Sequence, residues 1–183
     1  IAIYLTYIKA NYSEAKLFFQ KIIPEALSTD ALQLMILMET YGHYAGCIYR
    51  DGSLYDAVNA LRSSFKIAND LLTPSYQDLK IKKIVLEVKA FNLHTKSNVL
   101  HNMEKYKKAE RCLKRAISIY LENRIYPKEH VVLGMAYHDL GDIYSAVAKY
   151  NDAKENLKAS ILIKERSYKQ NKQDFTNPNL SLA

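Results

Sequence analysis

The sequence contains few residues that interrupt a helix, with five glycines and four prolines among its 183 residues. So few breakers over this length favour long helices over many short strands. Long apolar runs are also missing, and none approaches the roughly 18 residues that a membrane span needs. The chain is long enough for one domain with its own core. These absences predict an all-α protein with no membrane span.

Cysteine is scarce as well, with Cys47 and Cys112 far apart in the sequence. Two cysteines are too few for a disulfide scaffold, and they lack the spacing of a metal site. Both fall within helical patterns, so we expect buried free thiols. Free thiols fit the reducing cytoplasm, which is the location that the sequence favours.

Motifs that position catalytic groups are absent too: the sequence has no nucleophile elbow, no phosphate-binding loop and no HExxH helix. Helical spacing places His94 and His101 two turns apart on one face, with His138 one repeat further along. No cysteine or carboxylate cluster completes a tetrahedral metal site around them at the usual spacing. We therefore expect no enzyme activity, no catalytic residue, no metal site and no cofactor.

Positive charge is in excess, with a formal net charge of +7 and basic clusters within residues 80–83 and 105–115. One interpretation is an acidic partner or a nucleic acid. The other, which we favour, is a solvated outer face of helices, because helical spacing spreads these side chains along a surface. Base-reading helical repeats have a regular period and a paired specificity code that this chain lacks, so we expect no nucleic-acid partner.

An internal repeat is the main signal that the sequence does contain. An alanine recurs four times, each time followed by a large apolar residue four positions later. The position seven residues after the alanine completes the pattern. Offsets of four and seven place these side chains on one face of an α-helix. The alanines are Ala15, Ala57, Ala109 and Ala153, and the seventh positions hold Ile22, Ser64, Ala116 and Ser160.

A second helical pattern precedes each alanine and carries one mostly small residue on its apolar face. That residue stands twelve positions before the alanine and is Ile3, Ala45, Ser97 and Gly141 in the four copies. Between the two patterns of the second copy, Gly52 can adopt a left-handed backbone, and Ser53 with Asp56 resembles a capping box. Each unit is therefore predicted to be a helix, a tight turn and a helix, and such hairpins must stack to bury their apolar faces.

The best copy contains Tyr-His-Asp-Leu-Gly-Asp-Ile-Tyr at residues 137–144, followed by Tyr150, Ala153 and Leu157. With this Leu-Gly pair, tyrosine and second-helix alanine, residues 1–168 resemble the tetratricopeptide repeat family. The resemblance implies an all-α, right-handed superhelical solenoid of antiparallel helix pairs, with about four repeats in one domain over 1–183. The alanines recur after 42, 52 and 44 residues, against about 34 in the standard repeat. This longer period is similar to the kinesin-light-chain class.

Eight helices are expected, near residues 1–10, 12–27, 29–50, 53–71, 77–103, 105–123, 128–147 and 150–169. We expect Pro24 to kink or end its helix and residues 72–76 to form a linker. Residues 1–10 resemble part of a first helix and 177–183 the opening of another repeat, so we expect a piece of a longer protein. Uncapped solenoid ends expose apolar surface, which predicts self-association.

Ligands of this family bind in a concave groove that the first helices of successive repeats line. The resemblance, combined with helical spacing, gives the candidate peptide-binding residues Tyr49, Arg50, His94, Asn98, His101, Asn102, His138 and Asp142. Among the tyrosines, Tyr49 is expected to be the best exposed. Asparagine can donate and accept hydrogen bonds together, which suits a peptide backbone, but an ordinary solvated polar face stays open as the alternative. Gly42 and Gly46 are either an open groove floor or a close helix contact, and we favour the contact.

Two functions remain open at this stage. The first is a scaffold or adaptor that recruits a protein or peptide, with an acidic or mixed peptide favoured by the net charge. The second is a ligand-sensing regulatory module, a peptide receptor that controls an attached effector domain. What flanks the chain would separate them, because a DNA-binding domain or an ATPase upstream favours sensing.

Overall fold

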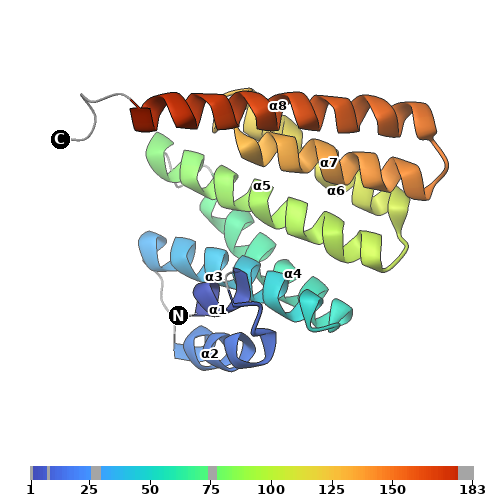
Figure 1. Cartoon of the computed structure of the whole chain (residues 1–183). Coiled ribbons are helices and arrows are strands. Elements are labelled where there is room, and N and C mark those ends of the chain that lie inside the picture. Colours follow the sequence, from blue (N-terminus) through green and yellow to red (C-terminus); the bar gives the residue numbers. More distant parts are fainter. Residues whose placement is uncertain (1, 8, 26–29, 74–77, 177–183) are drawn as a thin grey trace. The chain divides into compact units, whose positions relative to one another are not determined.

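A computed structural model describes residues 2–7, 9–25, 30–73 and 78–176, and within these ranges it is entirely helical, with no strand (Figure 1). The helices are α1 (Ala2–Tyr7), α2 (Tyr12–Glu25), α3 (Ala31–Arg50), α4 (Leu54–Leu71), α5 (Leu79–Asn102), α6 (Tyr106–Glu122), α7 (Val131–Ala146) and α8 (Tyr150–Thr176). They pair in chain order into four hairpins, so the all-α, tetratricopeptide-like class with about four repeats is confirmed.

The chain forms two compact units, Ile1–Ile119 and Tyr120–Ala183. The first holds α1 to α5 and most of α6, while in the second α7 and α8 lie against each other along their length (Figure 1). The single domain expected over 1–183 stays a prediction.

The recurring alanines lie where the helices of each hairpin meet. Ala15, Ala57 and Ala109 are fully buried, and Ala153 is 4% exposed. The position twelve residues earlier is also buried in the last three copies, as Ala45, Ser97 and Gly141, whereas Ile3 of the first copy is 49% exposed. A β-carbon added to Gly141 would lie 2.7 Å from Leu157 Cγ, so a larger residue would push α7 and α8 apart. The predicted repeat register is thereby confirmed.

Serine hydroxyls also tie the two helices of a hairpin together. Ser64 Oγ donates to the Met38 carbonyl at 2.8 Å, and Ser160 Oγ donates to the Gly134 carbonyl at 2.6 Å. Both pairs are buried and both span 26 residues. Because a buried hydroxyl without a partner is costly, these bonds favour one axial register of the second helix against the first.

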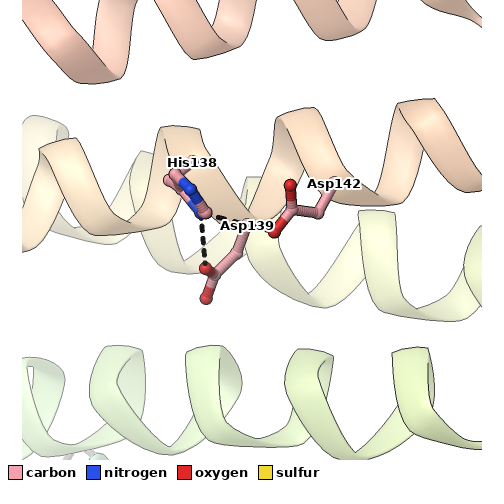
Figure 2. Close-up of side chains that lie close together, drawn as sticks. All are labelled: His138, Asp139 and Asp142. Atoms are coloured by element: carbon pink, nitrogen blue, oxygen red, sulfur yellow. Dashed lines mark ion pairs between the residues drawn. The ribbon is translucent and has the colours of Figure 1, made fainter.

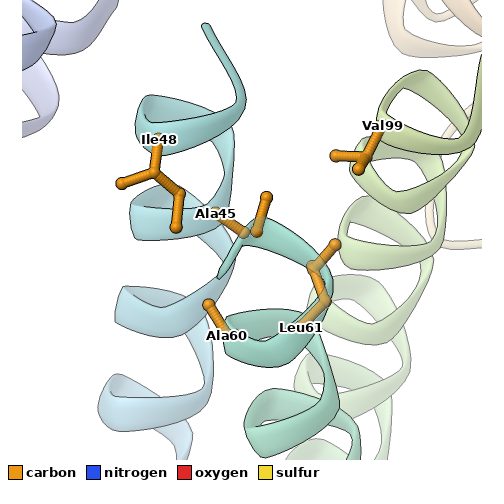
Figure 3. Close-up of a cluster of buried hydrophobic side chains, with 6 residues drawn as sticks. Ala45, Ile48, Ala60, Leu61 and Val99 are labelled. Atoms are coloured by element: carbon orange, nitrogen blue, oxygen red, sulfur yellow. The ribbon is translucent and has the colours of Figure 1, made fainter. Parts of the chain in front are cut away.

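Stacking between hairpins is visible in a core cluster of the first unit (Figure 3). Ala45 and Ile48 come from α3, Ala60 and Leu61 come from α4, and Val99 comes from α5 of the next hairpin. All five are 7% exposed or less. The apolar face that one hairpin cannot bury alone is thus covered by its neighbour.

Each hairpin turn contains a residue with a left-handed backbone, five positions before the recurring alanine. The residues and φ angles are Ala10 (50°), Gly52 (88°), Glu104 (58°) and Ala148 (58°). In the last three turns the following residue donates its N–H to the carbonyl five positions earlier, at 2.8–2.9 Å, as in a Schellman motif. The left-handed Gly52 is confirmed, whereas the other three turns lack the glycine that would have predicted this conformation.

The Ala148→Gly variant is expected to raise the free energy of unfolding by about 0.5–1 kcal/mol, because the left-handed backbone strains alanine but not glycine. Urea denaturation followed by circular dichroism measures this change. Ala159→Gly, inside α8, is the control and is expected to lower stability by about 1 kcal/mol. A loss of stability in both variants would contradict the strain at Ala148.

Several local expectations need correction. Ser53 precedes α4 with ψ at 65°, and its side chain makes no capping hydrogen bond, so the expected capping box is wrong. An extended backbone would aim the hydroxyl at the first N–H groups of the helix, and ψ 65° does not.

Some helix bounds also differ from those expected. α7 begins at Val131 instead of 128 because His130 is the cap, and its Nδ1 accepts a hydrogen bond from the Val132 N–H at 3.3 Å. α8 continues to Thr176, and α2 ends one residue after Pro24. Parts of the expected linker and the tail 177–183 lie outside the described residues.

Candidate peptide-binding surface

The row of polar residues expected on α5 is only partly accessible. Asn98 is half-buried and Asn102 is exposed, and Asn102 Nδ2 donates to the Asn98 carbonyl at 2.8 Å. His94 is 9% exposed, and the His101 ring packs 5.5 Å from the Tyr106 ring where α6 begins. Asn102, and in part Asn98 and His101, are therefore what a peptide could reach in this row.

Tyr49 and Arg50 lie together at the end of α3. The Arg50 guanidinium sits 4.7 Å from the centre of the Tyr49 ring, and its Nη1 donates to the Gly46 carbonyl at 2.6 Å. Tyr49 is half-buried against the core cluster of Figure 3, whereas Tyr55 is 75% exposed. The expectation that Tyr49 is the best exposed tyrosine is therefore wrong, because its ring is used for packing.

Gly42 is a close helix contact and not an open groove floor. A β-carbon added there would overlap Asn92 Oδ1 on α5. Asn92 is fully buried, and its Nδ2 donates to Ser64 Oγ at 2.6 Å, which links α5 to α4. Asn92 Oδ1 is buried without a hydrogen-bond partner in the described part of the chain. The Gly42 contact thus places a polar side chain at the point where three helices meet.

His43 joins α3 to α5 beside this contact. Its ring lies 5.1 Å from the Phe91 ring, and its Nε2 lies 3.5 Å from Glu39 Oε1 one turn earlier. The hydrogen bond from His43 lowers the pKa of the Glu39 carboxyl, although partial burial opposes this. His43 is not among the residues that the sequence pointed to, and the structure shows that its ring packs between two helices.

His138 and Asp142 lie in the second unit, one turn apart on α7, with Asp139 beside them (Figure 2). His138 Nδ1 is 3.3 Å from Asp142 Oδ2 and 3.6 Å from Asp139 Oδ1. The three side chains can offer a cation one nitrogen and two oxygens within 4.8 Å of one another. His138 and Asp142 are exposed and Asp139 is half-buried, and ion pairs of this kind are ordinary surface chemistry.

A pocket that the sequence did not predict lies between α4, α5 and α6 in the first unit, with a volume of about 660 Å³. Among the described residues, its lining combines apolar side chains with six cations and contains no carboxylate. Five of the cations come from three consecutive helices, and the sixth, Lys105, lies in the turn before α6. The weak signal that could have found the pocket is the basic cluster within 105–115, which we had interpreted as a solvated face.

Both cysteines are free, as expected, although Cys112 is half-buried where Cys47 is fully buried. Cys47 Sγ donates to the Tyr12 carbonyl at 3.2 Å. Burial raises the pKa of the Cys47 thiol, although a hydrogen bond with Thr6 partly lowers it. Burial also raises the pKa of the Cys112 thiol, although the charges of Lys96 and Arg111 oppose this.

Because the thiolate is the reactive form, we expect slow alkylation of both thiols by iodoacetamide at neutral pH in the folded chain. Cys47 is expected to react more slowly than Cys112, because it is the more buried of the two. Peptide mass spectrometry after timed quenching measures the two rates. In urea the rates should converge, and a folded chain that labels Cys47 as fast as Cys112 would contradict this placement.

Residues 89–166 match a family model described as tetratricopeptide repeat, over less than half of the chain. The match supports a tetratricopeptide-repeat family. Repeats of this family are non-catalytic scaffolds that generally mediate protein–protein interaction. A comparison with curated proteins finds no match. Among the described residues, no helix is both long and apolar enough to cross a membrane.

Proposed function

We propose that this chain is a scaffold that binds a partner protein or peptide and catalyses no reaction. The observation that carries the proposal is the tetratricopeptide-repeat match over 89–166, which falls on helical hairpins whose recurring alanines are buried as the repeat requires. The long spacing of those alanines supports membership of the long-period, kinesin-light-chain-like class. Two free cysteines are compatible with a reducing, cytoplasmic location.

The peptide is proposed to contact the first-helix face that carries Asn98 and Asn102. Their amides lie one turn apart on α5 and can each donate and accept, as a peptide backbone requires. Because Asn102 Nδ2 already donates to the Asn98 carbonyl, its side chain is held in place before the ligand arrives. A preordered side chain loses less entropy on binding.

The Asn98→Ala and Asn102→Ala double variant is expected to weaken partner binding by about 1–3 kcal/mol, at 0.5–1.5 kcal/mol for each lost hydrogen bond. The fold should survive, because neither side chain is fully buried. Isothermal titration against a partner isolated by pull-down measures the affinity.

The matched control is Asn151→Ala with Asn156→Ala on α8. Asn156 Nδ2 donates to the Asp152 carbonyl at 2.8 Å, so the control removes the same kind of bond within a helix. It should leave the affinity unchanged. Equal losses in both double variants, or no loss in the first, would remove this face from the binding site.

A further inference from the structure

The pocket between α4, α5 and α6 has an apolar floor. Residues from all three helices form it, namely Val58, Leu93, Leu100, Met103 and Cys112. Leu100 is 7% exposed and continues into the core, so the floor is supported by packed side chains. At about 660 Å³ the pocket falls within the usual range for ligand sites and has room for one or two side chains.

Cations surround this floor on every contributing helix. They are Arg62 on α4, Lys96 on α5, Lys105 in the turn, and Lys108, Arg111 and Arg115 on α6. No lining residue is acidic, and none of the six forms an ion pair with a carboxylate in the part of the chain that the structure describes. Elsewhere on α6, by contrast, Lys114 Nζ pairs with Glu110 Oε1 at 2.7 Å.

The cations on α6 lie close enough to repel one another. Lys108, Arg111 and Arg115 are spaced by three and four residues, which places them on one helix face. Burial lowers the pKa of the nearby Lys89 amine, and the Arg115 charge lowers it further. An anion bound over this face would relieve the repulsion, so the free pocket favours an acidic ligand.

We propose that this basic pocket binds an acidic peptide segment of a partner protein, which places one apolar side chain on the floor. The cations match the carboxylates of the segment, and the floor accepts the apolar anchor. Neither Asn98 nor Asn102 lines the pocket, so the site goes beyond the surface proposed above and does not depend on it.

A nucleic acid fits the pocket less well. Single strands bind through exposed aromatic platforms on which the bases stack. Of the described residues that line the pocket, only Tyr55 is aromatic, and the Lys105 Nζ already lies 5.7 Å from the centre of its ring. An apolar floor also offers nothing to a phosphate backbone, whereas it stabilises a leucine or phenylalanine.

The test uses a fluorescein-labelled, glutamate-rich peptide with one central leucine, titrated at low salt by fluorescence anisotropy. Lys108→Gln with Arg111→Gln is expected to weaken its binding roughly tenfold or more. Lys107→Gln with Lys114→Gln is the matched control, since it removes the same charge from the same helix outside the pocket. The control should change the affinity by less than about twofold. Replacing the leucine of the peptide by glycine should cost roughly tenfold.

The pocket variant is expected to fold with an equal or higher melting temperature, because removing two of the cations relieves repulsion. Asn98→Ala with Asn102→Ala should leave the probe affinity unchanged, so failure of one proposal is distinguishable from failure of the other. Equal losses in both charge variants would show that net charge alone attracts the probe and would overturn the pocket. The proposal would also be overturned if the probe did not bind the wild type. The same holds if a labelled oligothymidylate bound more tightly than the peptide and depended on the same residues.

Discussion

Ala153→Phe is expected to lower the free energy of unfolding by about 3 kcal/mol. Ala153 lies where α8 packs on α7, and its carbonyl would be 3.3 Å from a β-carbon at Gly141. The two helices are already in close contact there, so a phenyl ring has no space without separating them. Urea denaturation monitored by circular dichroism measures the loss.

Lys154→Phe is the matched control for this substitution. Lys154 is exposed on the same turn of α8, so the same ring is introduced without filling the helix contact. Its cost is expected to stay within about 0.5 kcal/mol. If Ala153→Phe were tolerated equally well, the repeat register would be wrong in the second unit.

Gly42→Ala is expected to cost about 2 kcal/mol, although alanine is the better helix former by about 1 kcal/mol. The new methyl group would overlap Asn92 Oδ1, which would have to move away from Ser64. Moving it breaks a buried hydrogen bond and leaves polar groups without partners, which outweighs the gain in helix propensity. Thermal and urea unfolding of the single variant give the sign of the effect.

A double-mutant cycle separates the steric cause from a general effect on α3. Asn92→Ala alone should also destabilise, because it removes the bond to Ser64 and leaves a cavity. In the double variant the methyl group of residue 42 no longer meets the amide, so the combined cost should be smaller than the sum by about 1 kcal/mol or more. Strict additivity would show that the contact between the two residues is not the reason for glycine at position 42.

Helix α5 contributes to both candidate surfaces of the first unit. Asn98 and Asn102 belong to the polar face, whereas Leu93, Lys96 and Leu100 belong to the basic pocket. Residues four or seven apart share a helix face, and these two sets follow different faces. A single helix of the repeat can therefore present two chemically distinct surfaces, and the paired variants above test each of them separately.

The helical spacing of apolar and small residues predicted the helices and the alanines at which they pack. Seven of the eight helices begin within two residues of the expected position, and all four recurring alanines are buried. Local patterns suffice for this, because residues three, four and seven apart share one helix face whatever packs against it. The turns were predicted less fully, since Glu104 and Ala148 adopt the left-handed backbone without being glycine.

The candidate site was predicted less well than the fold. Helical spacing places His94 and Asn98 on similar sides of α5, but a neighbouring element buries the first and leaves the second half-exposed. Helical spacing also could not decide whether Gly42 forms an open groove floor or a close contact with a neighbouring helix. The choice depends on Asn92, which lies fifty residues further along the chain and fills the space.

The sequence by itself determined that this protein is a series of helical hairpins, because the repeat of alanine and small residues specifies which helix faces must pack. Only the tertiary structure decided where its charges converge. Arg62, Lys96 and Arg111 belong to three different helices, and no spacing within one helix relates them. They surround one pocket because stacking brings α4, α5 and α6 together, and stacking is fixed by contacts between side chains that are distant in sequence.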